Sequence, residues 1–298
     1  MKSSRLVFSV LLIACGQIQA QEYAFKVLVN KGKNELKSGE NWQPVKVGSS
    51  IKSADELRVS ENSYLGLVHV SGKPLELKKS GQYSVRNLEG QMKGGTSVLN
   101  KYTDFILSAN TGPKNNLAAT GAVNRGGNDI KVLLPRPELA VVYGNEVTIS
   151  WECNKALGPY VISFKSMFGD ELNSVESAEN FVVVNLNDRN FENEDNIIVV
   201  VSSKSNKQKI SDEYTLKKLS KADKERIKNE LNEITEQTSE QNALNNFFIA
   251  GFYEKNGLLI DATAYYLKAI KLAPDVPAYK EDYENFLLRN GIKSPPKK

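Results

Sequence analysis

The chain has 298 residues, of which 40% are apolar and 25% are charged, and its formal net charge is +4. This composition is typical of a globular protein, and the length is enough for two or three domains. Lysine and arginine form no dense stripe interleaved with aromatic residues, so we expect no nucleic-acid partner.

The first twenty residues, 1–20, are predicted to be a signal peptide. Lys2 and Arg5 provide a positive start, and Leu6 to Ala14 form an apolar core that is too short to span a bilayer as a helix. No other segment of the sequence is apolar enough to cross a membrane. We therefore expect an exported protein that is periplasmic or associated with the outer membrane.

Two cleavage sites are compatible with this signal. The residues ending at Ala20 fit signal peptidase I, whereas Leu12 to Cys15 fit a lipobox in which Cys15 becomes an acylated first residue. Strand-like sequence begins near Tyr23, which would leave only a short tether after Cys15. Cleavage after Ala20 is therefore preferred, and lipidation of Cys15 with membrane attachment is the alternative. Cleavage after Ala20 leaves Cys153 as the only cysteine, so an internal disulfide is not expected.

Residues 21–109 begin with short runs of alternating apolar and polar residues separated by Gly, Asn and Ser, which predicts an all-β domain. Trp42 to Val59 and Tyr64 to Leu77 resemble the FecR-type β domain of bacterial envelope proteins. The matching positions are Gly48, Ile51, Asp55, Leu57, Leu65, Leu67, Gly72, Leu75 and Leu77. Sigma-regulator members of that family also have a transmembrane helix and a cytoplasmic segment, and neither is found in this sequence.

A helix is predicted at residues 94–109, at the end of this first domain. Its apolar residues follow three- and four-residue steps and are Val98, Leu99, Tyr102, Phe105 and Ile106. The following residues, 110–128, are rich in Gly, Asn and Thr and lack periodicity. They predict a linker that leaves the first domain mobile relative to the second.

Residues 129–218 return to strand patterns and predict a β-sandwich. Val147, Ile149 and Trp151 fall on one face of the run from Glu146 to Asn154, and the segment from Gly158 to Ser166 also alternates. These two runs resemble the second and third strands of an immunoglobulin-like or fibronectin type III domain, including the core tryptophan.

Residues 219–298 predict a helical module. Ser220 and Asp223 form a capping box, and an apolar helical stripe follows. The chain from Ala243 onward resembles one tetratricopeptide repeat, with small or aromatic residues and a closing proline at the family positions: Ala250, Tyr253, Ala262, Tyr266, Ala269 and Pro274. A single repeat cannot bury its apolar face alone, so we expect helices at 220–236 and 278–292 to cover it. The packing face of the second is predicted to be Tyr283, Phe286 and Leu287.

The tetratricopeptide resemblance implies a groove that holds a protein partner. Leu244, Phe247, Glu254 and Lys255 match positions that face the groove in that family. The alternative is a plain helical bundle without a ligand, because one repeat makes only a short groove.

The sequence contains no specific catalytic pattern. His69, the only histidine, lies in a strand pattern and is expected to be structural or at the surface, and Cys153 is expected to be a buried structural thiol. The acids Glu192, Glu194 and Asp195 predict a solvated loop rather than a hydrolase pair or a calcium site. We therefore expect no enzyme activity, no metal and no cofactor.

Taken together, the patterns predict a multidomain α+β protein, with two all-β domains followed by a small all-α module of the helical-repeat kind. The expected function is a non-enzymatic scaffold or adaptor of the cell envelope that binds an envelope protein through its C-terminal helices. Two alternatives remain: binding of peptidoglycan or another glycan through the β domains, and a signalling adaptor related to the FecR system.

Overall fold

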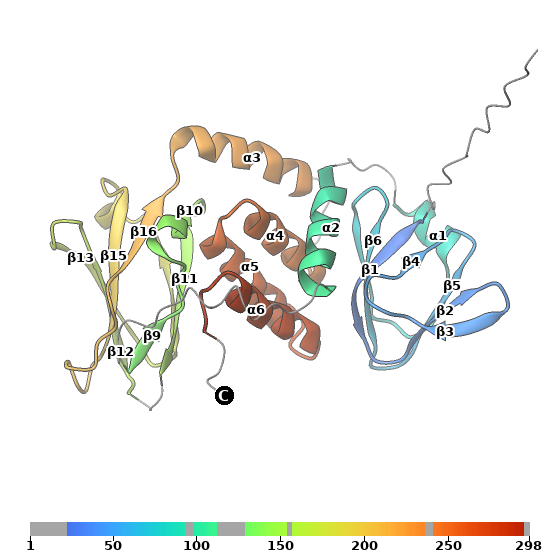
Figure 1. The fold of residues 1–298 in the computed structure, drawn as a ribbon, viewed down its shortest axis with the longest axis horizontal. Coiled ribbons are helices and arrows are strands. Elements are labelled where there is room, and N and C mark those ends of the chain that lie inside the picture. The colour runs from blue at the N-terminus through green and yellow to red at the C-terminus, as the bar shows by residue number, and fades with distance from the viewer. Residues whose placement is uncertain (1–22, 93–97, 112–128, 154–156, 236–240, 295–298) are drawn as a thin grey trace, which may run out of the picture.

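The computed structural model shows a mixed α+β protein with several antiparallel sheets and a C-terminal cluster of three helices (Figure 1). It describes residues 23–92, 98–111, 129–153, 157–235 and 241–294. The predicted signal peptide with Cys15, and residues 112–128 of the predicted linker, lie outside the described residues. Within the described part, no helix is long and apolar enough to cross a bilayer.

Strands β1 to β8 build two four-stranded sheets, which we call the N-terminal β unit. The sheet orders are β4-β1-β6-β7 and β3-β2-β5-β8. The apolar core includes Phe25 and Val27 of β1, Leu57 of β5, and Leu65 and Leu67 of β6. The elements are β1 (Phe25–Lys31), β2 (Asn34–Ser38), β3 (Asn41–Pro44), β4 (Ser50–Ile51), β5 (Glu56–Val59), β6 (Tyr64–His69), β7 (Pro74–Leu77), β8 (Gly81–Ser84) and the short helix α1 (Val85–Gly90).

Strands β9 to β16 build the second β unit, a sandwich of a three-stranded sheet, β14-β11-β9, and a five-stranded sheet, β10-β16-β15-β12-β13. The inward faces alternate along the strands as predicted, and Val147, Ile149 and Trp151 are all buried between the sheets. The elements are β9 (Ile130–Val132), η2 (Pro137–Leu139), β10 (Val141–Val142), β11 (Glu146–Cys153), β12 (Tyr160–Lys165), β13 (Glu171–Ser177), β14 (Phe181–Asn185), η3 (Arg189–Phe191), β15 (Asn196–Ser203) and β16 (Tyr214–Lys218).

The C-terminal helical cluster consists of α4 (Ala243–Lys255), α5 (Leu259–Leu272) and α6 (Pro277–Arg289). The Asn242 side chain caps α4 by accepting from the Asn245 backbone N–H, and Gly257 provides the positive φ of the turn into α5. The predicted small residues, Ala250, Ala262 and Ala269, are fully buried, which lets the helices pack closely. Tyr283, Phe286 and Leu287 are buried too, so the predicted packing face of α6 is confirmed.

Helices α2 (Val98–Thr111) and α3 (Lys221–Thr235) complete the helical region. The serine half of the predicted capping box of α3 is present, because the Ser220 hydroxyl accepts from the Asp223 backbone N–H at 3.2 Å. The Asp223 carboxylate accepts from the Ser220 hydroxyl at 2.7 Å, instead of from the Ser220 backbone N–H that a full capping box would use. Helix α2 was expected at the end of the first β domain. In the structure its buried residues Tyr102 and Ile106 belong to the same apolar core as α4.

The helical cluster lies between the two β units, with α2 on the side of the N-terminal unit and α3 across the top (Figure 1). Its core includes Leu28 and Val29 of β1 and Tyr64 and Val68 of β6. On the other side, Ile260 of α5 belongs to the core of the second β unit. Both β units are therefore packed against the same three helices.

Candidate functional site

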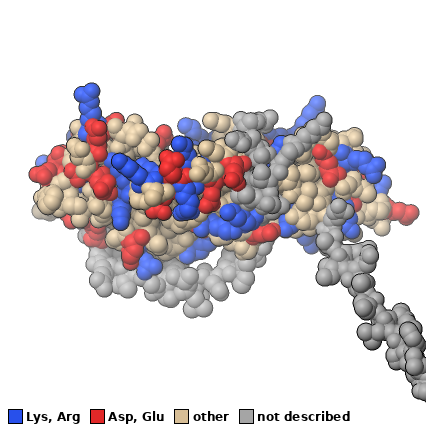
Figure 2. Space-filling view, turned by 90° about the horizontal axis from the view of Figure 1, so that it is seen from above, with Lys and Arg blue, Asp and Glu red and all other residues tan. Residues whose placement is uncertain are grey.

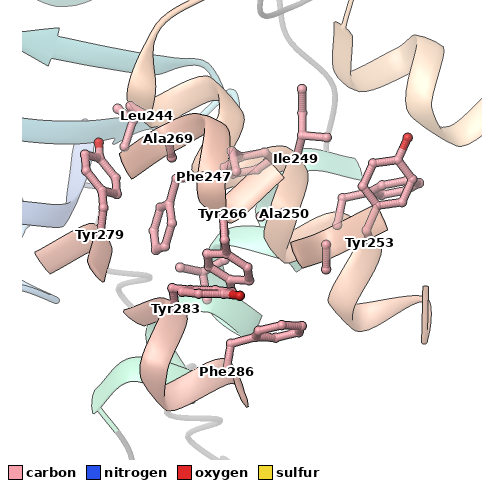
Figure 3. Close-up of a cluster of buried hydrophobic side chains, with 14 of the residues drawn as sticks. Leu244, Phe247, Ile249, Ala250, Tyr253, Tyr266, Ala269, Tyr279, Tyr283 and Phe286 are labelled. Atoms are coloured by element: carbon pink, nitrogen blue, oxygen red, sulfur yellow. The ribbon is translucent and has the colours of Figure 1, made fainter. Parts of the chain in front are cut away.

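The four groove positions predicted from the sequence differ sharply in exposure. Leu244 and Phe247 are completely buried, the Glu254 side chain is 4% exposed, and Lys255 lies at the surface. Figure 3 shows Leu244 and Phe247 inside the packed cluster. Three of the four positions are therefore buried within the chain, and none of those three is open to a partner.

Phe247 is at the centre of an aromatic cluster inside the helical cluster. Its ring packs edge-to-face against Tyr266 of α5 at 5.8 Å and against Tyr279 of α6 at 5.3 Å between ring centroids. Tyr266 in turn lies against Phe286, 4.9 Å away, and Figure 3 shows these rings side by side. Phe247 therefore joins all three helices. Each such aromatic pair adds roughly 0.5–1.5 kcal/mol of stabilisation beyond the burial of its apolar area.

Glu254 forms a buried ion pair that ties the end of α4 to the end of α6. Its carboxylate accepts from Nε and Nη2 of Arg289, both at 2.6 Å, and from the Tyr266 hydroxyl at 2.8 Å. Asn290 donates a further hydrogen bond at 2.9 Å. A carboxylate buried with this set of donors is satisfied, and its role in this arrangement is to hold the helices together.

The N-terminal β unit is attached to the helical cluster through Glu76 of β7. The Glu76 carboxylate accepts from the Leu244 backbone N–H at 2.8 Å, at the start of α4, and from the Tyr64 hydroxyl at 2.7 Å. A carboxylate is favourable at a helix N-terminus because it meets unpaired N–H groups and the positive end of the dipole. The Tyr64 hydroxyl also bonds the Tyr279 hydroxyl at 2.6 Å, which links β6 to α6.

The same interface needs a glycine in the middle of β6. A Cβ atom placed on Gly66 would lie 3.0 Å from Cδ1 of Leu244 and 3.1 Å from Cβ of Val29. These distances are shorter than ordinary van der Waals contact. Glycine at this position therefore lets α4 approach the sheet closely.

Helix α2 occupies the next face of α4. A Cβ atom on Gly251 would lie 2.5 Å from the Ile106 side chain, so the two helices also meet at a glycine. Lys255 donates from Nζ to the Lys101 carbonyl at 2.9 Å, with Nζ over the Tyr102 ring. Lys255, the one exposed residue of the four groove positions, thus contacts α2 through its ammonium group.

The second β unit is attached through Asp261 of α5. This buried carboxylate accepts from the backbone N–H groups of Tyr143 and Gly144, at 2.9 and 2.7 Å. Burial raises the pKa of Asp261 to about 6, although the two N–H donors and nearby Lys224 favour its charged form. The link between α5 and the sandwich therefore contains a group that titrates in mildly acidic solution.

The residues considered for catalysis are dispersed in the structure. His69 ends β6, with Nδ1 2.7 Å from the Ser71 hydroxyl and its ring against Phe25, and burial lowers its pKa. Cys153 is half-buried in the other β unit. Among the described residues, no group of three or more His, Cys, Asp or Glu side chains is arranged to hold a metal ion. Figure 2 shows acidic and basic side chains interspersed over one face of the molecule.

No protein-family model matches the chain, and no curated protein sequence is significantly similar to it. The candidate site is therefore defined by its geometry alone. It consists of the three faces of the helical cluster that meet the N-terminal β unit, α2 and the second β unit.

Sequence reasoning did not identify the residues that attach these faces, namely Glu76, Gly66, Gly251 and Asp261. One signal was present: β6 reads Tyr-Leu-Gly-Leu-Val-His, and its first five residues are all buried. A strand that is apolar on both faces is one that is covered on both faces, and a glycine inside a strand often marks a close approach. Nothing comparable in the sequence indicates that Asp261 bonds the turn at Tyr143.

We expect Gly66→Ala to weaken the docking of α4 on β6. The added methyl group overlaps Leu244 and Val29, so the free energy of unfolding in urea should fall by roughly 1–3 kcal/mol. In a chain that already carries Leu244→Ala, the loss should be smaller, because one of the overlapping groups has been removed. Gly90→Ala is the matched control, since no heavy atom lies within 4 Å of its Cβ position. Equal losses in both backgrounds would show that Gly66 and Leu244 are not coupled.

We expect Asp261→Asn to change how stability depends on pH. Because burial raises the folded-state pKa of Asp261 to about 6, from an ordinary value of 3.8, its stabilising contribution is fully present below pH 3.8 and is lost as the pH rises through 6. Relative to the non-titrating variant, the wild type should lose roughly 2 kcal/mol of unfolding free energy between pH 4 and pH 7.

Urea unfolding at several pH values measures this difference. Asp275→Asn is the control, because Asp275 is exposed and its pKa is lowered by Lys31, so it titrates below this window. A difference between wild type and Asp261→Asn that stays constant from pH 4 to pH 7 would contradict the expected titration.

Proposed function

We propose that the chain is a non-enzymatic scaffold or adaptor of the cell envelope, in which the C-terminal helices hold two β domains and present a surface to a protein partner. The domain identities are part of this proposal: a FecR-like β domain at 21–109, an immunoglobulin-like or fibronectin type III-like sandwich at 129–218, and a tetratricopeptide-like module at 219–298. The three-plus-five strand arrangement and the antiparallel α4–α5 pair are consistent with the last two.

The observation that carries the proposal is the position of the helical cluster. It shares apolar core with the N-terminal β unit at Leu28 and Tyr64, and with the second β unit at Ile260. A catalytic site needs convergent reactive groups, whereas these interfaces consist of packed side chains and satisfied hydrogen bonds. Their evident effect is to fix two β units relative to each other, which is what a scaffold requires.

A partner of the helical region would meet the composite surface formed by α4 and α2. Of the predicted groove residues, only Lys255 is exposed, and Lys101 and Phe105 of α2 lie beside it. Export from the cytoplasm and cleavage after Ala20 complete the proposal. They rest on the sequence of residues 1–20 alone.

Removing the helices is not a suitable test of this function. A chain ending at Lys218 would expose Leu28, Val29, Tyr64 and Val68, which the helices cover, so truncation would create a new apolar surface. We therefore compare point variants of the full chain in a cross-linked capture from cell envelopes. Lys255→Glu should reduce capture of the specific partner at least roughly tenfold, corresponding to 1.4 kcal/mol of binding free energy.

The matched control is Lys268→Glu, which makes the same charge change on an exposed position of α5. It should leave capture unchanged, and the partner should bind the wild type but not Lys255→Glu when both proteins are pure. If capture is unchanged by Lys255→Glu, the α4–α2 surface is not the docking site. If the chain instead sediments with purified peptidoglycan and captures no protein, the glycan-binding alternative replaces the scaffold.

A further inference from the structure

One sheet edge of the second β unit differs from every other edge in the described part of the chain. Four sheets have eight edges, and β14 is the edge whose strand, Phe-Val-Val-Val-Asn, has four apolar residues and no charge. The other seven are short, polar or interrupted: β4 and β10 have two residues each, β9 carries Lys131, β3 and β7 contain Pro44 and Pro74, β13 contains Glu171 and Glu176, and β8 begins at Gly81.

The distinction matters because exposed edge strands promote pairing between chains. Proteins usually block such edges with a charge, a proline, a bulge or a short strand. Strand β14 has none of these, and its pairing with β11 runs without a register shift from Phe181 to Asn185. It therefore offers a regular edge without a bulge.

The backbone of β14 has free hydrogen-bonding groups on this edge. The Trp151 N–H donates to the Asn180 carbonyl and the Leu186 N–H donates to the Asn145 carbonyl, which fixes the alternation of the ladder between β11 and β14. It follows that Val182 and Val184 bond to β11, whereas Phe181, Val183 and Asn185 turn their backbone groups outward.

These outward groups are only partly occupied. The Phe181 carbonyl accepts from the Ser177 hydroxyl at 2.9 Å, and the Asn185 carbonyl accepts from the Asp188 N–H at 3.3 Å. Both groups of Val183, at the centre of the strand, lack a hydrogen-bond partner among the described residues. An added strand would satisfy them.

The side chains of the same residues are also exposed. Phe181 and Val183 are each 48% exposed, and both lie on the outer face of the three-stranded sheet, while Val182 and Val184 point into the core. Two large apolar side chains thus lie on an edge that already has unpaired backbone groups. A second strand would cover both features at once.

The composition of β14 indicates which strand fits. A partner strand must bring apolar residues and no charge, and β14 itself meets this condition. In an antiparallel pair centred on Val183, the two Val183 residues face each other and Phe181 faces Asn185 of the second copy. In this register the flanking acids also avoid each other, because Glu179 faces Asn187 and Asp188 faces Ala178.

We propose that the chain forms a two-fold symmetric dimer in which the β14 strands of two copies pair antiparallel about Val183. The two three-stranded sheets then join into one six-stranded sheet. The interface is isologous, so it closes with two copies and does not extend into a fibre. It also doubles any partner-binding surface on the helices, although the dimer does not depend on that function.

Sedimentation velocity of the full chain over a range of concentrations tests the dimer. The wild type should shift from the mass of one chain towards that of two. Val183→Lys places two like charges across the axis and should raise the dissociation constant at least roughly tenfold, equivalent to 1.4 kcal/mol. Circular dichroism verifies that the variant is folded, which is expected because the Val183 side chain points to solvent.

Phe168→Ser is the matched control. Phe168 is 94% exposed at the turn between β12 and β13, so its replacement removes exposed apolar surface without altering β14. This variant should dimerise like the wild type. If Phe168→Ser abolishes dimerisation and Val183→Lys does not, association occurs through the wrong surface and the proposal fails.

A cysteine cross-link tests the register independently. Cα atoms of a hydrogen-bonded antiparallel pair lie about 5.5 Å apart, within the range of a disulfide. Val183→Cys should therefore give a covalent dimer on mild oxidation, whereas Phe168→Cys should not. A wild type that stays monomeric at all concentrations, a larger oligomer, or no cross-link at position 183 would overturn the arrangement.

Discussion

The packing of α4 against the outer face of β6 is the contact on which the arrangement of the molecule depends. It brings Leu244 over Gly66, places the start of α4 on the Glu76 carboxylate and joins the Tyr64 hydroxyl to Tyr279. Because the inner face of β6 already belongs to the core of the N-terminal unit, this one strand is covered on both sides. The helices and the N-terminal β unit therefore share an apolar core across β6.

A common device recurs at the three faces of the helical cluster. At each face a backbone position without a side chain lets two elements meet: Gly66 under Leu244, Gly251 under Ile106, and Gly144 beside the Asp261 carboxylate. At the faces that meet the two β units, the close approach is accompanied by buried polar links, in which Glu76 and Asp261 accept hydrogen bonds from backbone N–H groups. The protein thus combines apolar packing with a small number of specific polar links, and this limits how the units can be arranged.

Local elements were predictable, whereas their assembly was not. The alternation around Trp151 and the buried face of α6 follow from spacing, because strand and helix periods determine which residues share a face. The Ser220 cap of α3 follows from the residue type that opens the helix. The placement of α2 on α4 depends on contacts between residues about 150 positions apart, which periodicity does not encode. Leu244 and Phe247 match the groove positions of the repeat pattern, but other parts of the chain cover them. Burial and ligand binding require the same residue types.

The most direct test of this account is differential scanning calorimetry of the full chain. If the helical cluster joins the two β units as described, the protein should unfold in a single transition whose calorimetric and van't Hoff enthalpies agree. Two or more separable transitions, with one β unit melting while the rest stays folded, would contradict the claim that the helices hold both units in one cooperative structure.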